Sequence, residues 1–220
     1  MLDWLIKLVP IAVFGAVANV VAKHGLEAFQ GLLMFLGFIL LTLCIHALIY
    51  YTSVVWAVGK RTPAQFLGQG ADAILTGLST NSSLATVPIT LRCLTEGLGV
   101  SQQSARLSTC IGTNLNNDGI MLYEAMAALF LAQAAGLDLG WSDQATILGA
   151  SIMAGIGIAG IPEAGYVMLP LVLAVAGFSD DQIAVYWPLI LPVDWILARV
   201  RSAVNVMGDM TVAILLDRLE

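Results

Sequence analysis

A polar run bracketed by two glycines, residues 112–119, interrupts one of the most apolar parts of the chain. The run contains three asparagines and one aspartate, and amide and carboxylate oxygens are suitable ligands for a hard cation. An ionised carboxylate inside a hydrocarbon layer is costly and by default marks a functional site. The run therefore predicts a break in a transmembrane helix, where backbone and side-chain oxygens face a polar site. The alternative is an aqueous loop between two helices.

A second polar set lies at helical spacing in the last apolar segment. Arg201, Asn205 and Asp209 follow one another at intervals of four, so their side chains share one face of a helix. Arginine binds a carboxylate through parallel hydrogen bonds, and the oxygens suit a cation. This face therefore predicts a buried site for a carboxylate ligand and a cation. Arg199 has the alternative of extending to the membrane interface.

Composition restricts the class of protein. Hydrophobic residues make up 59% of the chain and charged residues only 11%, whereas a soluble protein has roughly a quarter charged residues. We therefore expect a multi-pass protein of the cell membrane, with the lipid bilayer as its surroundings. The net charge of -6 comes without a basic patch, so no nucleic-acid partner is expected. The three cysteines lack paired spacing, and neither a disulfide nor a metal cluster is predicted.

Spans and interrupted segments must position these residues. Two segments consist of apolar runs shorter than the about 20 residues that cross a bilayer, and each is divided by a polar or glycine-rich tip. We predict that both are re-entrant helical hairpins. The predicted organisation is two N-terminal spans in residues 1–62 and a core in 63–220, with a hairpin at 63–98, a broken span at 104–136, a hairpin at 144–177 and a last span at 182–218.

The charges of the loops agree with this organisation. Lysine and arginine collect on the cytoplasmic side of membrane proteins. If each hairpin enters and leaves on one side, the basic loop residues fall inside and the acidic ones outside. The hairpins then open to opposite sides, as in the inverted repeat of a secondary transporter. The inner set is Lys7, Lys60, Arg61, Arg106 and Arg218, and the outer set is Asp138, Asp143, Asp180 and Asp181.

Four motifs in a fixed order carry a family resemblance. They are the serine-rich run 80–88, the run Asn116-Asn-Asp-Gly119, the glycine-rich run 157–165 and the segment 193–209. The last segment contains Asp194-Trp195, Arg201, Asn205 and Gly208-Asp209. Together they make the chain similar to the C-terminal half of the dicarboxylate/amino acid:cation symporters, the glutamate transporter homologues. The resemblance implies an all-α membrane protein, an elevator-type transport core with four transmembrane spans and two re-entrant helical hairpins in an inverted repeat. The resemblance also implies that the second hairpin is the extracellular gate.

The resemblance implies roles for individual residues. The substrate pocket would be lined by Ser82, Ser83, Ile161, Arg201, Ser202 and Asn205, with Arg201 holding a carboxylate. A first sodium site would use Gly112, Asn116, Asn205 and Asp209. A second would use main-chain oxygens near Asn114, Gly155, Ile156 and Ile158, and Asp118 with Asn116 would serve a third.

The chain departs from the family pattern at four positions. Asn117 replaces a methionine, Ile120 a threonine, Glu163 a glycine, and Ala198 an aspartate that pairs with the ammonium group of amino-acid substrates. Because alanine cannot pair with an ammonium, we expect a small dicarboxylate as the substrate. The alternative is that Asp194 or Glu163 takes over that contact, which would make the chain an acidic amino-acid:sodium symporter. Sodium is the expected coupling ion, with protons as the alternative.

Sodium-coupled symport of a small carboxylate accounts for the broken span, both hairpins and the charged helix face together. A channel would need a continuous polar stripe, and a hydrolase would need a base or metal near its serines, so no enzyme is expected. His46, in an apolar span, is interpreted as a packing residue. The family's first four spans have no counterpart here. We expect a homo-oligomer, a trimer in the family, or a partner chain that supplies the scaffold. The alternative is a ligand-binding module that needs a partner to transport.

Overall fold

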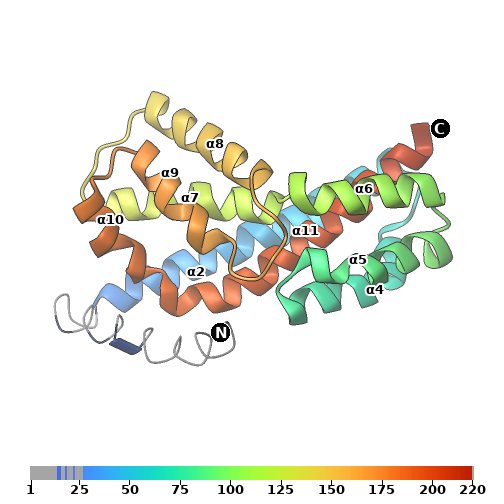
Figure 1. Cartoon of the computed structure of the whole chain (residues 1–220), viewed down its shortest axis with the longest axis horizontal. Coiled ribbons are helices and arrows are strands. Elements are labelled where there is room, and N and C mark those ends of the chain that lie inside the picture. Colours follow the sequence, from blue (N-terminus) through green and yellow to red (C-terminus); the bar gives the residue numbers. More distant parts are fainter. Residues whose placement is uncertain (1–13, 16–17, 19–21, 23–26, 220) are drawn as a thin grey trace.

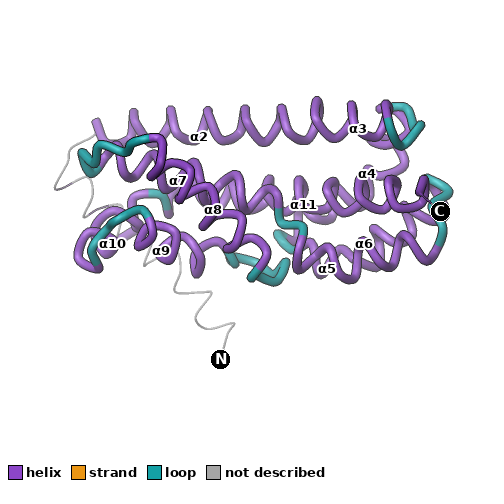
Figure 2. The backbone as a smooth tube through the Cα atoms, turned by 90° about the horizontal axis from the view of Figure 1, so that it is seen from above, coloured by secondary structure: helices purple, strands orange, loops and turns teal. Residues whose placement is uncertain are grey.

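The computed structural model describes residues 14–15, 18, 22 and 27–219, and regular structure in this part of the chain is helical. The first predicted span and Lys7 lie largely outside the described residues. The helices run mostly along one long axis, as Figures 1 and 2 show from two directions. The predicted all-α class is therefore confirmed for the described residues.

A long apolar helix forms one side of the bundle (Figure 2). It consists of α2 (Glu27–Ile45), a π-helical segment (His46–Tyr51) and α3 (Thr52–Ala57), which follow one another without a break. Within the described residues, Gln30–Ala57 is the one helix that is by itself long and apolar enough to cross a membrane. The bent pair Asp180–Leu189 and Leu191–Leu219 would make a second if counted as one span.

The first predicted hairpin is formed by α4 (Pro63–Thr80) and α5 (Ser83–Arg92), and a π-helical turn (Cys93–Gly97) continues α5. Its tip consists of Asn81, in a left-handed conformation with φ +54°, and Ser82, whose hydroxyl caps α5. Both residue types favour such positions.

The tip of this hairpin is short, although polar residues already gather from Thr76 onward. Helix α4 continues to Thr80, and hydroxyl groups near its end donate to carbonyls one turn earlier, from Thr76 to Asp72 at 2.6 Å and from Thr80 to Thr76 at 2.7 Å. Pro88 lies inside α5.

The predicted break in the middle span is present. Helices α6 (Gln102–Leu115) and α7 (Asp118–Ala134) are separated by Asn116 and Asn117, whose backbone is not helical. Helix α6 begins close to the predicted boundary at 104, and α7 ends close to 136. The polar run therefore joins two half-helices.

The second hairpin consists of α8 (Trp141–Ile156) and α9 (Gly165–Val175), with an irregular tip at 157–164. The two hairpins lie at opposite ends of the molecule and their tips meet near its middle (Figure 1). The hydroxyl of Ser82 and the backbone N–H of Leu84 both donate to the carbonyl of Gly160, at 2.7 and 3.1 Å. A Cβ atom at Gly160 would collide with the hydroxyl of Ser83, so the contact requires glycine.

The last predicted span is bent in the structure. Helix α10 (Asp180–Tyr186) and a 3-10 turn (Trp187–Leu189) precede α11 (Leu191–Leu219), and the two parts are bent by 73°. The predicted span 182–218 is therefore divided near Ile190. Pro188 and Pro192 flank the bend and supply no N–H donors, which prevents one continuous helix.

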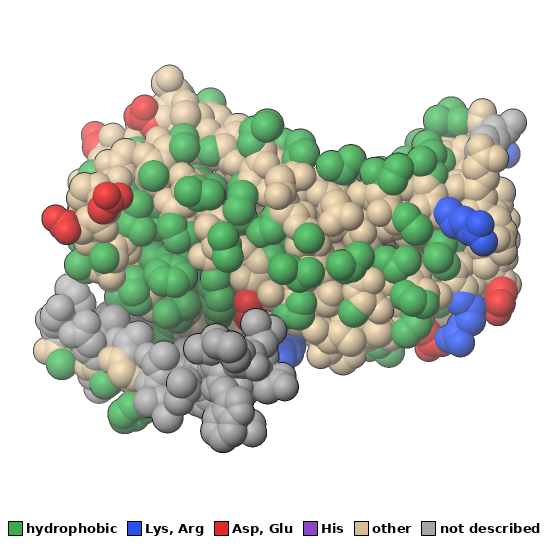
Figure 3. Space-filling view, in the orientation of Figure 1, with side chains coloured by type: hydrophobic (Ala, Val, Ile, Leu, Met, Phe, Trp, Pro, Cys, Tyr) green, Lys and Arg blue, Asp and Glu red, His purple; other side chains and the backbone are tan. Residues whose placement is uncertain are grey.

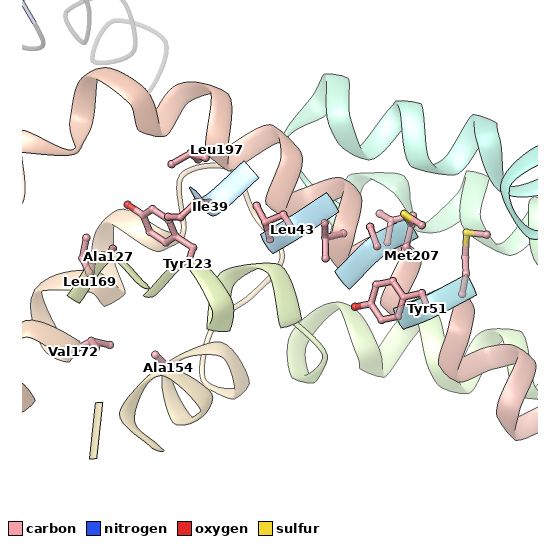
Figure 4. Packing of buried hydrophobic residues seen from close by; sticks show 14 of the residues in the cluster. Ile39, Leu43, Tyr51, Tyr123, Ala127, Ala154, Leu169, Val172, Leu197 and Met207 are labelled. Carbon is pink, nitrogen blue, oxygen red and sulfur yellow. The ribbon is translucent and has the colours of Figure 1, made fainter. Parts of the chain in front are cut away.

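Helix α11 is the centre of the fold. Its residues 201–211 are all buried, and it packs against α4, α6, α7 and α2. Figure 4 shows apolar side chains from α2, α7 and α11 in this core, among them Leu43, Tyr123 and Met207. Acidic side chains gather at the end that carries α10, and lysine and arginine lie at the other end among a few acidic ones (Figure 3). This separation agrees with the predicted sorting of loop charges.

Candidate functional site

Arg201 is buried in the middle of α11, with 3% of its surface exposed. Its guanidinium donates two hydrogen bonds to the carboxylate of Asp194, at 2.8 and 3.2 Å, and lies 3.7 Å from the centre of the Tyr123 ring. Gly165 of α9 packs closely on it, since a Cβ there would lie 3.2 Å from the guanidinium. The predicted carboxylate-binding arginine is therefore held by an internal carboxylate, and a ligand carboxylate would join or replace Asp194.

The two hairpin tips and α11 are joined by a chain of polar contacts. Ser202 donates to the Asn81 side-chain oxygen at 3.1 Å, and the Asn81 amide donates to one oxygen of Glu163 at 3.2 Å. Within the described residues, the other oxygen of Glu163 is buried without a hydrogen-bond partner. Glu163 also has φ +62°, a conformation that costs about 1 to 3 kcal/mol for a residue other than glycine. A strained glutamate with a free acceptor thus faces this junction.

The six residues predicted to bind the substrate come from the two tips and α11. Ser83 has a buried hydroxyl that makes no hydrogen bond among the described residues, and Ile161 has an exposed side chain on the second tip. The structure places Ser82, Ser83 and Ile161 on the tips, and Arg201, Ser202 and Asn205 on the adjoining part of α11.

The predicted first cation set surrounds a buried carboxylate. Asp209 is 1% exposed, and within the described residues its side chain accepts one hydrogen bond, from the Asn116 amide at 3.3 Å. A Cβ atom at Gly112 would contact this carboxylate, so the backbone of α6 lies directly beside it. Asn205 lies one turn before Asp209 on α11. A buried carboxylate with one neutral donor is poorly compensated, and this set fits a cation.

The predicted third set contains Asp118, which receives contacts from a distant helix. One oxygen accepts a hydrogen bond from the Tyr51 hydroxyl at 2.7 Å and lies 3.4 Å from the His46 Nε2 atom. The other oxygen has no hydrogen bond in the described part of the chain, which leaves a position for a cation beside Asn116. The sequence analysis did not identify Tyr51 and assigned His46 to packing. Neither carries a local signal, because both lie more than 65 residues from Asp118 in the chain.

The predicted second set has a different environment. The carbonyl oxygens of Gly155 and Ile158 both accept hydrogen bonds from the side-chain amide of Asn117, each at 3.0 Å. The side chains of Asn114 and Ile156 are exposed. Two of the four oxygens predicted for this set are therefore satisfied by a protein donor.

Glu124 is a further buried carboxylate that the sequence analysis missed. It is fully buried on α7, next to Tyr123, and neither of its oxygens has a hydrogen-bond partner in the part of the chain that the structure describes. A lone acidic residue in an apolar segment is the signal that identified Asp118, and it applies equally here. The junction therefore contains more carboxylates than were predicted.

Comparison with known proteins places this geometry in a family. The model of the sodium:dicarboxylate symporter family matches residues 1–219. The chain belongs to this family. It is 39% identical to the excitatory amino acid transporter 1 of Mus musculus over 213 residues, which cover 97% of this chain and 36% of that protein. It is 37% identical to the excitatory amino acid transporter 3 of Mus musculus over 201 residues, covering 91% and 38%.

The chain spans about a third of the length of these relatives. The sodium:dicarboxylate symporter family consists of transport proteins rather than enzymes, which agrees with the expectation that this chain is not an enzyme. The motifs that carried the resemblance lie in the break at Asn116 and Asn117, the two tips and α11, which the structure brings together.

Proposed function

We propose that this chain forms the transport core of a sodium-coupled symporter for an acidic amino acid, in a multi-pass assembly of the cell membrane. The observation that carries the proposal is the junction of the two tips with α11, where buried Arg201 and the free oxygen of Glu163 are both available to a ligand. Arg201 would bind a substrate carboxylate, and Glu163 would accept from an ammonium group.

The balance of charges favours an amino acid over the dicarboxylate first expected. Asp194, Glu124 and Glu163 provide three carboxylates at this junction, against the single guanidinium of Arg201. A dicarboxylate would add two negative charges and no positive one, whereas an acidic amino acid also brings an ammonium. Uncompensated buried charge is costly. The relatives are named as amino acid transporters, which also supports this alternative.

The loss of the aspartate at position 198 does not exclude an ammonium. Ala198 is buried and cannot accept a hydrogen bond. Glu163 stands in place of a tip glycine, and its unpartnered oxygen supplies a new acceptor on the facing hairpin. We therefore assign the ammonium contact to Glu163. Ala198 and the apolar Ile120 are the observations that favour a dicarboxylate, which is the second candidate.

Sodium would act as the co-transported ion. Asp209, with Asn116 and the backbone beside Gly112, would hold one sodium, and Asp118 with Asn116 would hold another. The positive charge would compensate carboxylates that have few protein partners. This compensation would make binding of the anionic substrate depend on sodium.

Access to the junction requires the tips to separate. Three hydrogen bonds join them: from Ser82 and Leu84 to Gly160, and from Asn81 to Glu163. Each of these hydrogen bonds contributes about 1 kcal/mol net, so separating the tips costs about 3 kcal/mol. A ligand whose binding free energy differs by that amount between the open and closed states can shift the equilibrium between them. We propose that the irregular second tip is the moving gate.

An elevator mechanism would move the core, residues 63–220, against a scaffold. Residues 1–62 would supply part of that scaffold and also the first helix of the core, from which Tyr51 contacts Asp118. A longer chain, a homo-oligomer or a partner chain would supply the rest of the scaffold. Large apolar side chains on α2, the π-helical segment and α3 are exposed and available to lipid or scaffold, among them Leu33, Phe38, Leu41, Leu48 and Trp56.

Uptake into vesicles containing the reconstituted chain tests this proposal. We expect accumulation of labelled aspartate or glutamate with external sodium and none with choline. Glu163→Gln removes the charge that faces the ammonium, so aspartate should bind at least about tenfold more weakly. Succinate, which has no ammonium, should bind no more weakly than to the wild type. Glu96→Gln, at an exposed glutamate, is the matched control.

Two results would change the conclusion. Tighter binding of succinate than of aspartate, with no effect of Glu163→Gln, would favour the dicarboxylate candidate. Sodium-dependent binding without accumulation would indicate a ligand-binding module that needs a partner chain for transport.

A further inference from the structure

The side-chain amide of Asn117 lies between two main-chain carbonyls of the second hairpin. Asn117 is fully buried at the break between α6 and α7. Its nitrogen lies 3.0 Å from the carbonyl oxygens of both Gly155 and Ile158. One amide group has two N–H donors, and each carbonyl thus receives one of them. The resemblance assigned these two carbonyls to a sodium ion.

The orientation of this amide follows from the polarity of its neighbours. The backbone N–H of Gly119 donates to the Asn205 side-chain oxygen at 2.8 Å. The nitrogen of Asn205 then faces the oxygen of Asn117 at 3.2 Å, which leaves the nitrogen of Asn117 facing the carbonyls. A backbone N–H can only donate, so the direction of the whole chain of hydrogen bonds is determined. If the amide of Asn117 or Asn205 were flipped, two N–H groups or two oxygen atoms would face each other.

A sodium ion does not fit together with this arrangement. Hard cations take oxygen ligands, and an N–H donor aimed at the same oxygens carries partial positive charge. The family signature has a methionine at this position, and a thioether has no N–H to donate. The departure at position 117 therefore exchanges a side chain without donors for one whose two donors match two carbonyls.

We propose that the Asn117 amide takes the place of the second cation in this chain, and that it holds the second tip against the broken span without sodium. If the sodium-coupled function proposed above holds, the chain couples one sodium fewer than a relative in which that site binds sodium. The role of the amide in holding the tip does not depend on transport.

Hydrogen exchange of the second tip, residues 155–164, measured on the full chain in sodium and in choline, tests the proposal. Asn117→Met removes both donors. The measured quantity is the ratio of the exchange rate in choline to the exchange rate in sodium. We expect this ratio to be about tenfold larger in Asn117→Met than in the wild type, because the tip of the variant would need a cation. Gln133→Ala, which removes an exposed amide from the adjoining helix α7, should keep the wild-type ratio.

Equal ratios in the wild type and Asn117→Met would overturn the proposal. Asn117→Asp keeps the size of the side chain if the methionine variant does not fold. Its carboxylate would face two carbonyl oxygens, so its tip should also become sodium-dependent, and a wild-type ratio in this variant would equally overturn the proposal.

The wild type provides an independent measurement of the number of coupled ions. On a double-logarithmic plot, the aspartate Kd should fall with sodium concentration with a limiting slope of about two, and a slope of about three would contradict the replacement of a cation. Absence of any aspartate binding would refute the proposed function, while the exchange ratios would still decide the role of Asn117.

Discussion

Replacement of Asp194 by asparagine should separate the internal role of Arg201 from its role in binding. The substitution keeps the size of the side chain and removes the charge that faces the guanidinium. In the wild type both hydrogen bonds of this pair are buried, with 3% and 0% of the two side chains exposed. In the variant the guanidinium stays buried against Tyr123 without a counter-charge.

Two effects of opposite sign are expected. Removing one partner of a buried ion pair costs about 3 to 5 kcal/mol, which corresponds to a fall of roughly 10 °C in Tm for a chain of this size. A ligand carboxylate no longer competes with Asp194 for Arg201. Aspartate should therefore bind at least about tenfold more tightly and recover a larger part of the lost stability.

Thermal unfolding in detergent, with sodium and with or without aspartate, measures both effects. Asp72→Asn is a matched control, because Asp72 pairs with Arg92 at 3.3 Å on the surface, with 72% and 58% of the side chains exposed. Such a pair contributes about 0 to 1 kcal/mol. The reasoning is refuted if Asp194→Asn is no more destabilising than Asp72→Asn. It is also refuted if the variant binds aspartate more weakly, which would mean that Asp194 supports the bound geometry.

Two further substitutions test the cation sets. Asp209→Asn should stabilise the chain in choline, because it removes a poorly compensated buried carboxylate. The same substitution should abolish the increase of Tm on adding sodium. An unchanged response of the Tm to sodium would contradict the first cation site. Tyr51→Phe removes the hydroxyl that donates to Asp118, a charge-assisted hydrogen bond of about 1.5 to 3 kcal/mol. This variant should therefore change the sodium concentration for half-maximal binding. The control Tyr50→Phe should leave that concentration unchanged. Equal sodium titrations of the two tyrosine variants would show that Asp118 takes no part in binding sodium.

Much of the fold was predictable because its irregular parts carry distinct residue types. Polar or glycine-rich runs inside apolar segments indicated both hairpins and the break at Asn116 and Asn117. The extent of the first tip was not predictable from residue types, because Thr76 and Thr80 favour turns yet bond within α4. The bend in the last predicted span was not predicted, because the apolar run continues across it between Pro188 and Pro192.

The candidate site was predictable where its residues share a helix. Helical periodicity placed Arg201, Asn205 and Asp209 on one face. Asp194 lies seven residues before Arg201, two turns away on that face, so the pairing could have been read from the spacing as well. The contact of Tyr51 with Asp118 joins positions 67 residues apart, and it depends on how α2 packs on α7. No local pattern contains that information.

The departures from the family pattern gain their meaning from the partners they contact. Considered singly, Asn117 in place of methionine and Glu163 in place of glycine add a buried polar group and a strained backbone, and each alone should destabilise the chain. In the structure both act on the second tip. The Asn117 amide satisfies the carbonyls where α8 ends, and the Glu163 carboxylate accepts from Asn81 on the first tip. The two substitutions thus hold the same segment from its two sides. The chain therefore retains a closed tip through hydrogen bonds of its own side chains, and the cost of each new polar group is offset by a contact that the replaced residue could not make.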